Sequence, residues 1–305
     1  MVKPNCRTHA RPQFSTCQRS CHKVDTQERN QFLIEIVDSI QIHKSMLNIS
    51  LQTNPKDILK EISVLREEKG REEDVAKVIE KALRAGHDWE VNLLFEKALN
   101  YQHMVMNEDA KNENDKDLVA RKTSLLNMEE TILEAKFYIE KYKLMQWKSR
   151  IHRFLGRLYD YKNESKKAIA EYEKALTFVN EDPDYAEKKI PRNLELEAFL
   201  AYSTLQSGDM ERGLEMSRRT YEKFNKTVEG KRLKKKDYVT WAIWKSGVSI
   251  RTIKALLEQS VEFDKKVMLN WLNEAEKDLN PINKKLWSDF SYRKNEINSI
   301  KLKLI

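Results

Sequence analysis

The sequence predicts an all-α protein made of antiparallel helical hairpins that stack as an α-solenoid. The chain of 305 residues has only 7 Gly and 6 Pro, with no Pro between Lys56 and Asp182. Long proline-free runs rich in Lys, Glu, Leu and Ala favour helix. Apolar residues recur at spacings of about 3 and 4, the period of an amphipathic helix, and no strand–turn–strand pattern interrupts them.

Residues 1–26 show no apolar period, so we expect a disordered tail. All 3 cysteines lie in this segment. The alternative is a structural zinc site of Cys6, His9, Cys17 and Cys21, because thiolate and imidazole ligands suit tetrahedral zinc. Their spacing is not that of a standard zinc finger. We therefore predict no metal and no other cofactor.

Residues 27–70 are expected to form an N-terminal helical hairpin. Apolar side chains between Phe32 and Leu47 form one broad face of its first helix. Pro55 starts the second helix at the position where proline is favoured, and Gly70 ends it.

Residues 71–225 contain three repeat-like hairpins, and the most regular one spans residues 147–183. Its first helix carries an apolar stripe of Phe154, Leu155, Leu158 and Tyr159. Its second helix carries small and aromatic residues at helical spacing, namely Ala168, Tyr172, Ala175 and Leu176. Such a hairpin cannot bury both stripes alone, so we expect it to stack on neighbours.

These residues resemble the tetratricopeptide repeat, W-x2-L-G-x2-Y followed by Ala, an aromatic, Ala and Pro. The matching residues are Leu155, Gly156, Tyr159, Ala168, Tyr172 and Ala175. His152 occupies the usual Trp or Leu site, and Pro183 comes late. The resemblance implies a helical-repeat fold that binds a protein or peptide in a concave groove lined by the first helix of each hairpin.

Two further hairpins repeat this spacing. In the hairpin from Glu72 to Val105 the matching second-helix residues are Val91, Phe95 and Ala98. In the hairpin that begins after Pro191 they are Gly213, Ser217 and Thr220, so this copy is degenerate. The distance along the chain from the preceding hairpin to this copy is longer than the usual repeat length, which predicts an insertion around residues 185–192.

A polar segment and a long helix lie between the hairpin of residues 72–105 and the hairpin of residues 147–183. Residues 107–117 are expected to form an exposed loop. The helix that follows, to about Met145, has a heptad of Leu118, Leu125, Ile132 and Ile139. A heptad can form a coiled-coil dimer. We favour a solenoid helix packed on both neighbours, with Leu126, Leu133 and Phe137 widening its apolar face.

Residues 226–305 are expected to form a basic helical region that continues or caps the solenoid. This region has 18 Lys and Arg against 10 Asp and Glu, whereas the rest of the chain has 38 of each. A basic loop over residues 225–237 holds a candidate basic patch of Lys231, Arg232, Lys234, Lys235 and Lys236. Helices are expected after it, with the last one opening at Pro281.

The sequence gives no indication of an enzyme. It lacks the G-x-S-x-G, Walker and H-E-x-x-H motifs. Four of its histidines lie in separate helical segments without a recognisable arrangement of carboxylates, namely His43, His87, His103 and His152. No apolar run approaches the roughly 18 residues of a membrane span, and the first residues lack the apolar core of a secretory signal. We expect a cytoplasmic protein that does not engage membranes.

Two binding functions remain, and the favoured one is a protein-interaction scaffold. Arg150, Arg153 and Arg157 share one helix face, which by the repeat resemblance lines the groove. Guanidinium groups pair bidentately with carboxylates, so we predict an acidic peptide or protein partner there. The alternative for this face is plain solvation. The alternative function is association with nucleic acid through the basic patch, since clustered lysines attract phosphates.

Overall fold

The computed structural model describes residues 55–67, 70–84, 90–111, 113–261, 264–285 and 291–304. The chain divides into two compact units, Met1–Ile49 and Ser50–Ile305, and all described residues belong to the second. The helix predicted within residues 27–51 and the zinc alternative at Cys6, His9, Cys17 and Cys21 lie outside the described residues.

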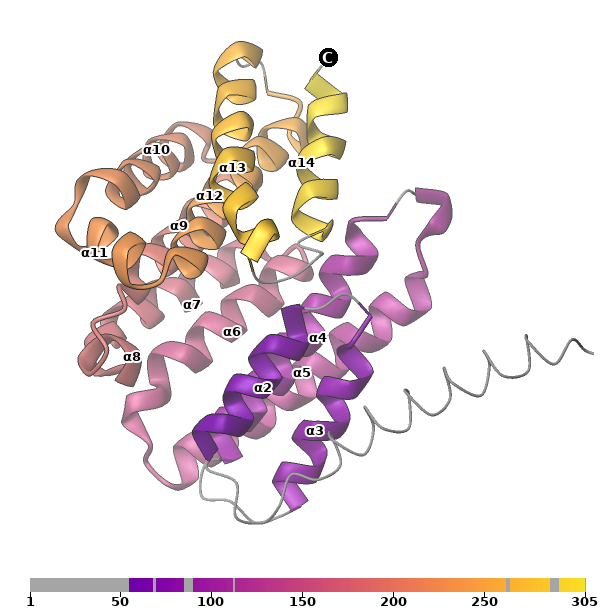
Figure 1. The fold of residues 1–305 in the computed structure, drawn as a ribbon, viewed down its shortest axis with the longest axis vertical. Helices are drawn as coiled ribbons and strands as arrows, with labels where there is room; N and C mark the ends of the chain where they lie inside the picture. The colour runs from indigo at the N-terminus through magenta and orange to yellow at the C-terminus, as the bar shows by residue number, and fades with distance from the viewer. Residues whose placement is uncertain are drawn as a thin grey trace, which may run out of the picture. The chain divides into compact units, whose positions relative to one another are not determined.

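All regular secondary structure in the described residues is helical (Figure 1). The α-helices are α2 (Pro55–Glu67), α3 (Glu72–Arg84), α4 (Glu90–Asp109), α5 (Leu118–Lys141), α6 (Lys148–Tyr161), α7 (Ser165–Thr177), α8 (Pro183–Ala186), α9 (Arg192–Gln206), α10 (Met210–Lys226), α11 (Val228–Lys236), α12 (Tyr238–Glu258), α13 (Lys265–Lys285) and α14 (Ser291–Leu304). Short 3-10 turns are η1 (Glu113–Asp115), η2 (Met145–Trp147) and η3 (Val179–Glu181). The all-α class is therefore confirmed.

Helices that follow one another in the sequence pack in pairs. The tightest pairs are α4 with α5, α6 with α7, α9 with α10, and α12 with α13. Helix α9 also packs on α7 and on α12, which links the pairs into a series (Figure 1). None of the described helices is long and apolar enough to span a membrane.

The α6–α7 pair has the close approach that its small residues predict. Ala168, Tyr172 and Ala175 are fully buried. A Cβ atom on Gly156 would lie 2.5 Å from the ring of Tyr172, so the two helices could not approach as they do with a larger residue. The Tyr172 ring in turn stacks on Phe199 of α9, with centroids 5.5 Å apart. The repeat-like residues thus join α6, α7 and α9 into one core.

Helix α5 buries only one side of its apolar surface. Met128, Ile132, Ala135 and Ile139 are buried against α4 and α6, whereas the first residue of the heptad, Leu118, is exposed. The residues expected to widen the packed face, Leu126, Leu133 and Phe137, are 50%, 51% and 57% exposed. The expectation of packing there was wrong, because no described helix covers that side of α5.

Three predicted boundaries also differ from the structure. Helix α4 continues to Asp109, so Asn107 is helical, and its Nδ2 donates to Glu72 Oε1 at 2.6 Å. The predicted basic loop is helix α11, capped by Thr227, whose Oγ1 accepts from the backbone N–H of Gly230 at 3.1 Å. Pro281 lies inside α13 and the last helix begins at Ser291. A proline removes one helical hydrogen bond and bends a helix without having to end it.

Candidate partner-binding groove

A groove of about 1540 Å³ runs along the first helices of three successive pairs, α6, α9 and α12. Arg153 of α6, Phe199 and Tyr202 of α9, and Trp244 and Arg251 of α12 all line it. Residues of α2, α4 and α14 form its borders. Charged side chains dominate its wall, with 12 Lys and Arg against 9 Asp and Glu among the lining residues.

The three arginines singled out in the sequence all lie in this wall, and each has an acidic partner within the chain. Arg150 Nε donates to Asp182 Oδ2 at 2.9 Å, and its Nη2 lies 2.6 Å from Asp184 Oδ2. Arg153 Nη2 donates to an oxygen of Glu195 at 2.7 Å. The spacing of 3 and 4 therefore predicts the shared face, but not that the guanidinium groups are already paired.

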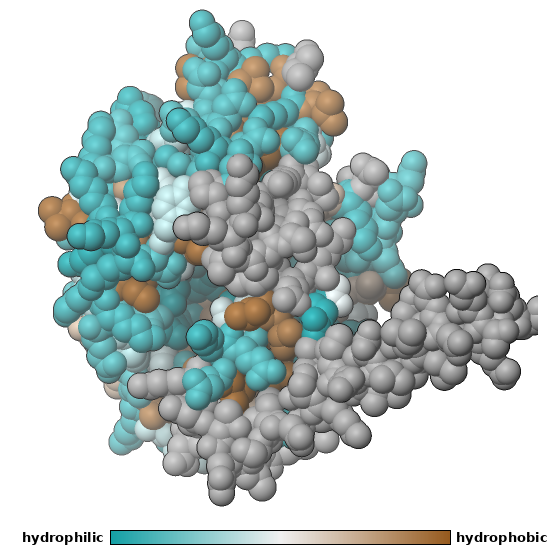
Figure 2. Space-filling view, in the orientation of Figure 1, coloured by the Kyte–Doolittle hydropathy of each residue, from teal (hydrophilic) through white to brown (hydrophobic). Residues whose placement is uncertain are grey.

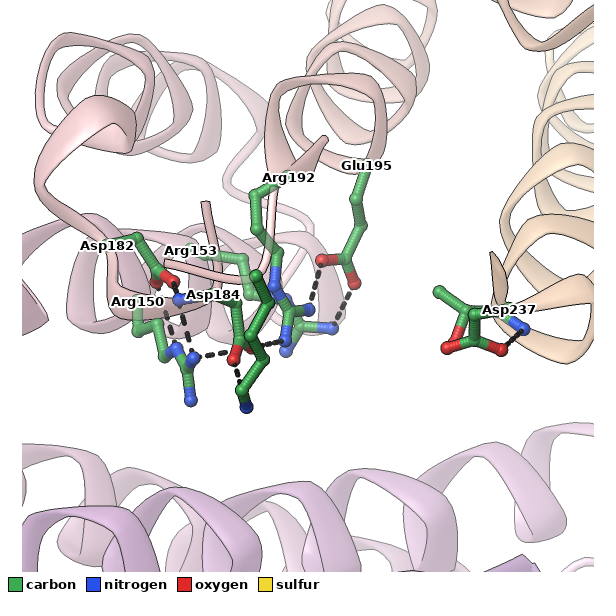
Figure 3. A network of polar contacts seen from close by, with 9 residues as sticks. Arg150, Arg153, Asp182, Asp184, Arg192, Glu195 and Asp237 are labelled. Carbon is green, nitrogen blue, oxygen red and sulfur yellow. Dashed lines mark hydrogen bonds and ion pairs between the residues drawn. The ribbon is translucent and has the colours of Figure 1, made fainter. Parts of the chain in front are cut away.

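Arg192 joins these pairs into one network of alternating charge (Figure 3). Its Nη2 donates to Asp184 at 2.5 Å and its Nη1 to Glu195 at 3.1 Å. The segment between α7 and α9 supplies Asp182 and Asp184, while α9 supplies Arg192 and Glu195. Asp237 of α12, labelled beside this network in Figure 3, instead caps its own helix by accepting from Thr240 N at 3.0 Å.

The network favours the ionised forms of Asp184 and Glu195. Burial alone would raise the pKa of Asp184, but Arg192 and Arg150 outweigh it and hold that pKa well below its ordinary value. Burial likewise opposes ionisation of Glu195, yet Arg153 and Arg192 lower its pKa. Loss of one member of such a buried ion pair strongly destabilises the folded protein. The segment between α7 and α9 is thus held to α6 and α9 by ion pairs as well as by packing.

A second polar cluster lies deeper in the wall and centres on Asp160 of α6. Its carboxylate accepts from Arg157 Nη1 at 3.0 Å, Tyr172 Oη at 2.7 Å and Ser203 Oγ at 2.5 Å. Arg157 Nη2 also donates to Tyr161 Oη at 2.6 Å. Burial raises the pKa of Asp160, while Arg157 and the two hydroxyl groups oppose that rise. This cluster ties α6 to both α7 and α9.

The ring of Phe199 is a meeting point for guanidinium groups from two helices. Arg157 of α6 and Arg251 of α12 place their guanidinium carbons 4.7 and 4.5 Å from its centroid. Arg153 lies 5.3 Å from the same centroid. Guanidinium groups are attracted to aromatic faces, and the attraction grows when water is excluded. Phe199 therefore holds cations together in the groove.

Arg251 differs from the other arginines at this ring. Within the described part of the chain, no carboxylate lies within 4.0 Å of its guanidinium nitrogens, whereas Arg153 pairs with Glu195 and Arg157 with Asp160. Burial, Arg293 and Arg157 lower the pKa of Arg251 to about 9. No sequence motif marked this residue, since its surroundings come from three helices distant in the chain.

The basic patch predicted in the sequence lies on α11, outside the groove. Lys231, Lys234, Lys235 and Lys236 are exposed, and Lys234 Nζ lies 4.1 Å from the ring centroid of Trp241. Arg232 is partly buried. The surface over α10 and α11 is mostly hydrophilic with scattered apolar side chains (Figure 2), and Val228 of α11 is 73% exposed. In the described residues, no group of three or more His, Cys, Asp and Glu side chains is arranged to hold a metal ion.

No protein-family model matches this sequence, and comparison with curated proteins finds no significant match either.

Proposed function

We propose that this chain is a non-enzymatic interaction module or scaffold of tetratricopeptide-like type. It binds an extended segment of a protein partner in the groove along α6, α9 and α12. The paired helices and the close approach at Gly156 support the stacked-hairpin arrangement on which the proposal depends. A groove of about 1540 Å³ offers room for several residues of a partner.

The observation that carries the proposal is the charge balance of the groove wall. The residues that line the groove carry 12 basic against 9 acidic side chains, an excess of positive charge. Aromatic and apolar side chains such as Phe199, Trp244 and Leu257 lie between the charges. Interfaces are enriched in aromatic residues and arginine, and complementary charge speeds and orients binding. The partner segment is therefore acidic with apolar residues interspersed.

Charge reversal of the groove tests this function without breaking the internal network. Lys254 is 39% exposed and Lys303 is exposed, and both line the groove. Replacing Arg150 or Arg153 would instead leave buried carboxylates unpaired and disturb the fold. The informative variant is thus the double substitution Lys254→Glu and Lys303→Glu. The matched control is Lys234→Glu with Lys235→Glu on α11, which carries the same change of charge outside the groove.

The assay is selection from a displayed random-peptide library, followed by fluorescence polarisation with the enriched peptides. We expect enriched peptides rich in Asp and Glu, with affinity reduced about tenfold or more in the groove variant, since each lost charge contact contributes roughly 1 kcal/mol. The control variant should bind normally. Peptides without acidic residues, or equal affinity for both variants, would contradict the proposal.

A second candidate function is association with nucleic acid through α11. Four exposed lysines lie on one short helix, and none of them forms an ion pair with a described residue. Such a patch gives weak, sequence-independent affinity that falls steeply with salt. Binding of a DNA or RNA oligomer at about 50 and 200 mM salt tests it. The α11 double variant should lose that binding, and the groove variant should keep it.

A further inference from the structure

Among the arginines that line the groove, one has no acidic partner in the described residues. Arg153 is paired with Glu195, Arg157 with Asp160, and Arg293 with Glu296 at 2.9 Å. Arg251, which lies among them, has no such partner in the part of the chain that the structure describes. Partly buried charges without a counter-ion are costly, so their retention points to a role outside folding.

The local structure holds the guanidinium of Arg251 in place. It lies over the ring of Phe199 and also over Gly247, one helical turn earlier. A Cβ atom on Gly247 would lie 2.8 Å from Arg251 Nη1, so a larger residue would shift the guanidinium from this position. Glycine within a helix costs about 1 kcal/mol relative to alanine. Here the missing side chain gives Arg251 a fixed position in the groove wall.

The surrounding charges make this position attractive to an anion. Besides burial, the positive charges of Arg293 and Arg157 lower the pKa of Arg251. The carboxylate of Glu296 acts in the opposite direction, but it lies beyond ion-pair distance of Arg251. Two of these guanidinium groups share the Phe199 ring. Guanidinium groups present donors in a planar fork that matches the oxygens of carboxylate and phosphate groups.

We propose that Arg251, supported by Arg157 and Arg293, forms a subsite for a single oxyanion group of the bound segment, a carboxylate or a phosphoryl group. Arg251 donates to the anion directly and gains the counter-charge that no described residue provides. Arg157 and Arg293 keep their own carboxylates and contribute the positive field. The subsite rests on the proposed function only in assigning the anion to a bound partner segment. The guanidinium groups that form the subsite all belong to this chain.

The test uses small anions and needs no partner. Thermal unfolding is measured with sodium phosphate and with sodium acetate, each against sodium chloride at the same ionic strength. For the wild type we expect the unfolding midpoint to rise by about 3 °C at roughly ten times the dissociation constant of the bound anion. A rise with phosphate alone assigns a phosphoryl group, and a rise with acetate assigns a carboxylate. A rise with neither overturns the subsite.

Three variants separate an anion site from a merely structural arginine. Arg251→Gln should abolish the rise and, in chloride, unfold at a higher temperature than the wild type, because it removes an unbalanced charge. Gly247→Ala keeps the charge but displaces the guanidinium, so it should weaken anion binding about tenfold. The control Arg219→Gln, on the exposed side of α10, should behave as the wild type.

A structural role gives the opposite pattern. If Arg251→Gln lowers the midpoint in chloride and anions stabilise it as they stabilise the wild type, Arg251 only stacks on Phe199 and the subsite is wrong. Should Arg251→Gln fail to fold, Gly247→Ala still decides the question through its anion affinity. If anions bind but no peptide shows affinity that depends on the groove, the proposed function is refuted and the subsite stands. The two failures are therefore distinguishable.

Discussion

Replacement of Asp160 by alanine tests whether the buried cluster holds α6 to its neighbours. The side chain is 1% exposed and accepts three hydrogen bonds, from Arg157, Tyr172 and Ser203. Asp160→Ala would leave the Arg157 guanidinium, itself 8% exposed, without its carboxylate. Breaking a buried ion pair on one side costs about 3–5 kcal/mol. Since a domain is stable by about 5–15 kcal/mol, this is about a fifth or more of the total.

The assay is urea unfolding at pH 7, followed by circular dichroism at a helical wavelength. The single variants Asp160→Ala and Arg157→Met and their combination form a double-mutant cycle. We expect the combination to be less destabilised than the sum of the singles by about 1–3 kcal/mol, because it removes both charges together. A cost below about 1 kcal/mol for Asp160→Ala, or strict additivity, would refute the assignment of this cluster as the tie between α6, α7 and α9.

Three further predictions follow from burial and charge. Arginine partners lower the pKa of Asp184 and Glu195, so their stabilisation is complete above the unfolded values of about 4 and is lost as the pH falls through the folded values. Urea unfolding between pH 2 and 6 should therefore show stability falling with acidity, and Glu195→Gln should flatten that slope rather than leave it unchanged. Ile132→Ala, at a fully buried position, should cost about 2–5 kcal/mol, whereas Leu133→Ala, at a position 51% exposed, should cost about 0.5 kcal/mol or less. Equal costs in chemical denaturation would mean that α5 is rotated from the orientation described. Gly156→Ala should cost about 1–3 kcal/mol through overpacking, despite the better helix propensity of alanine, and a stabilised variant would contradict the close approach of α6 and α7.

The sequence by itself determined the helical class and much of its core. Proline-free runs and the periods of 3 and 4 place Met128, Ile132 and Ala135 on one face, and these residues are buried. The small-residue positions Ala168 and Ala175 are likewise buried as the repeat resemblance implies. Periodicity works here because a helix turns by a fixed angle per residue, so spacing along the chain fixes which side chains share a face.

The extent of burial was beyond the sequence. Leu133 and Phe137 are as apolar as their buried neighbours, but no described helix covers them. Spacing defines a face and does not say how many neighbours that face will meet. The predicted loop at α11 was wrong for a related reason, since lysines are good helix formers and Leu233 finds a core to bury into.

The tertiary structure alone decided the character of the groove. The sequence predicts that Arg150, Arg153 and Arg157 share a face. The carboxylate partners of Arg150 and Arg153, namely Asp182, Asp184 and Glu195, lie about 30 to 40 residues away along the chain. Arg251 gains its position from Phe199, about 50 residues earlier, and from Gly247 beneath it. Electrostatic energy depends on distances between charges in space and on burial, neither of which a local sequence pattern encodes. The lack of an acidic partner for Arg251 among the described residues could therefore be found only after the helices had been placed.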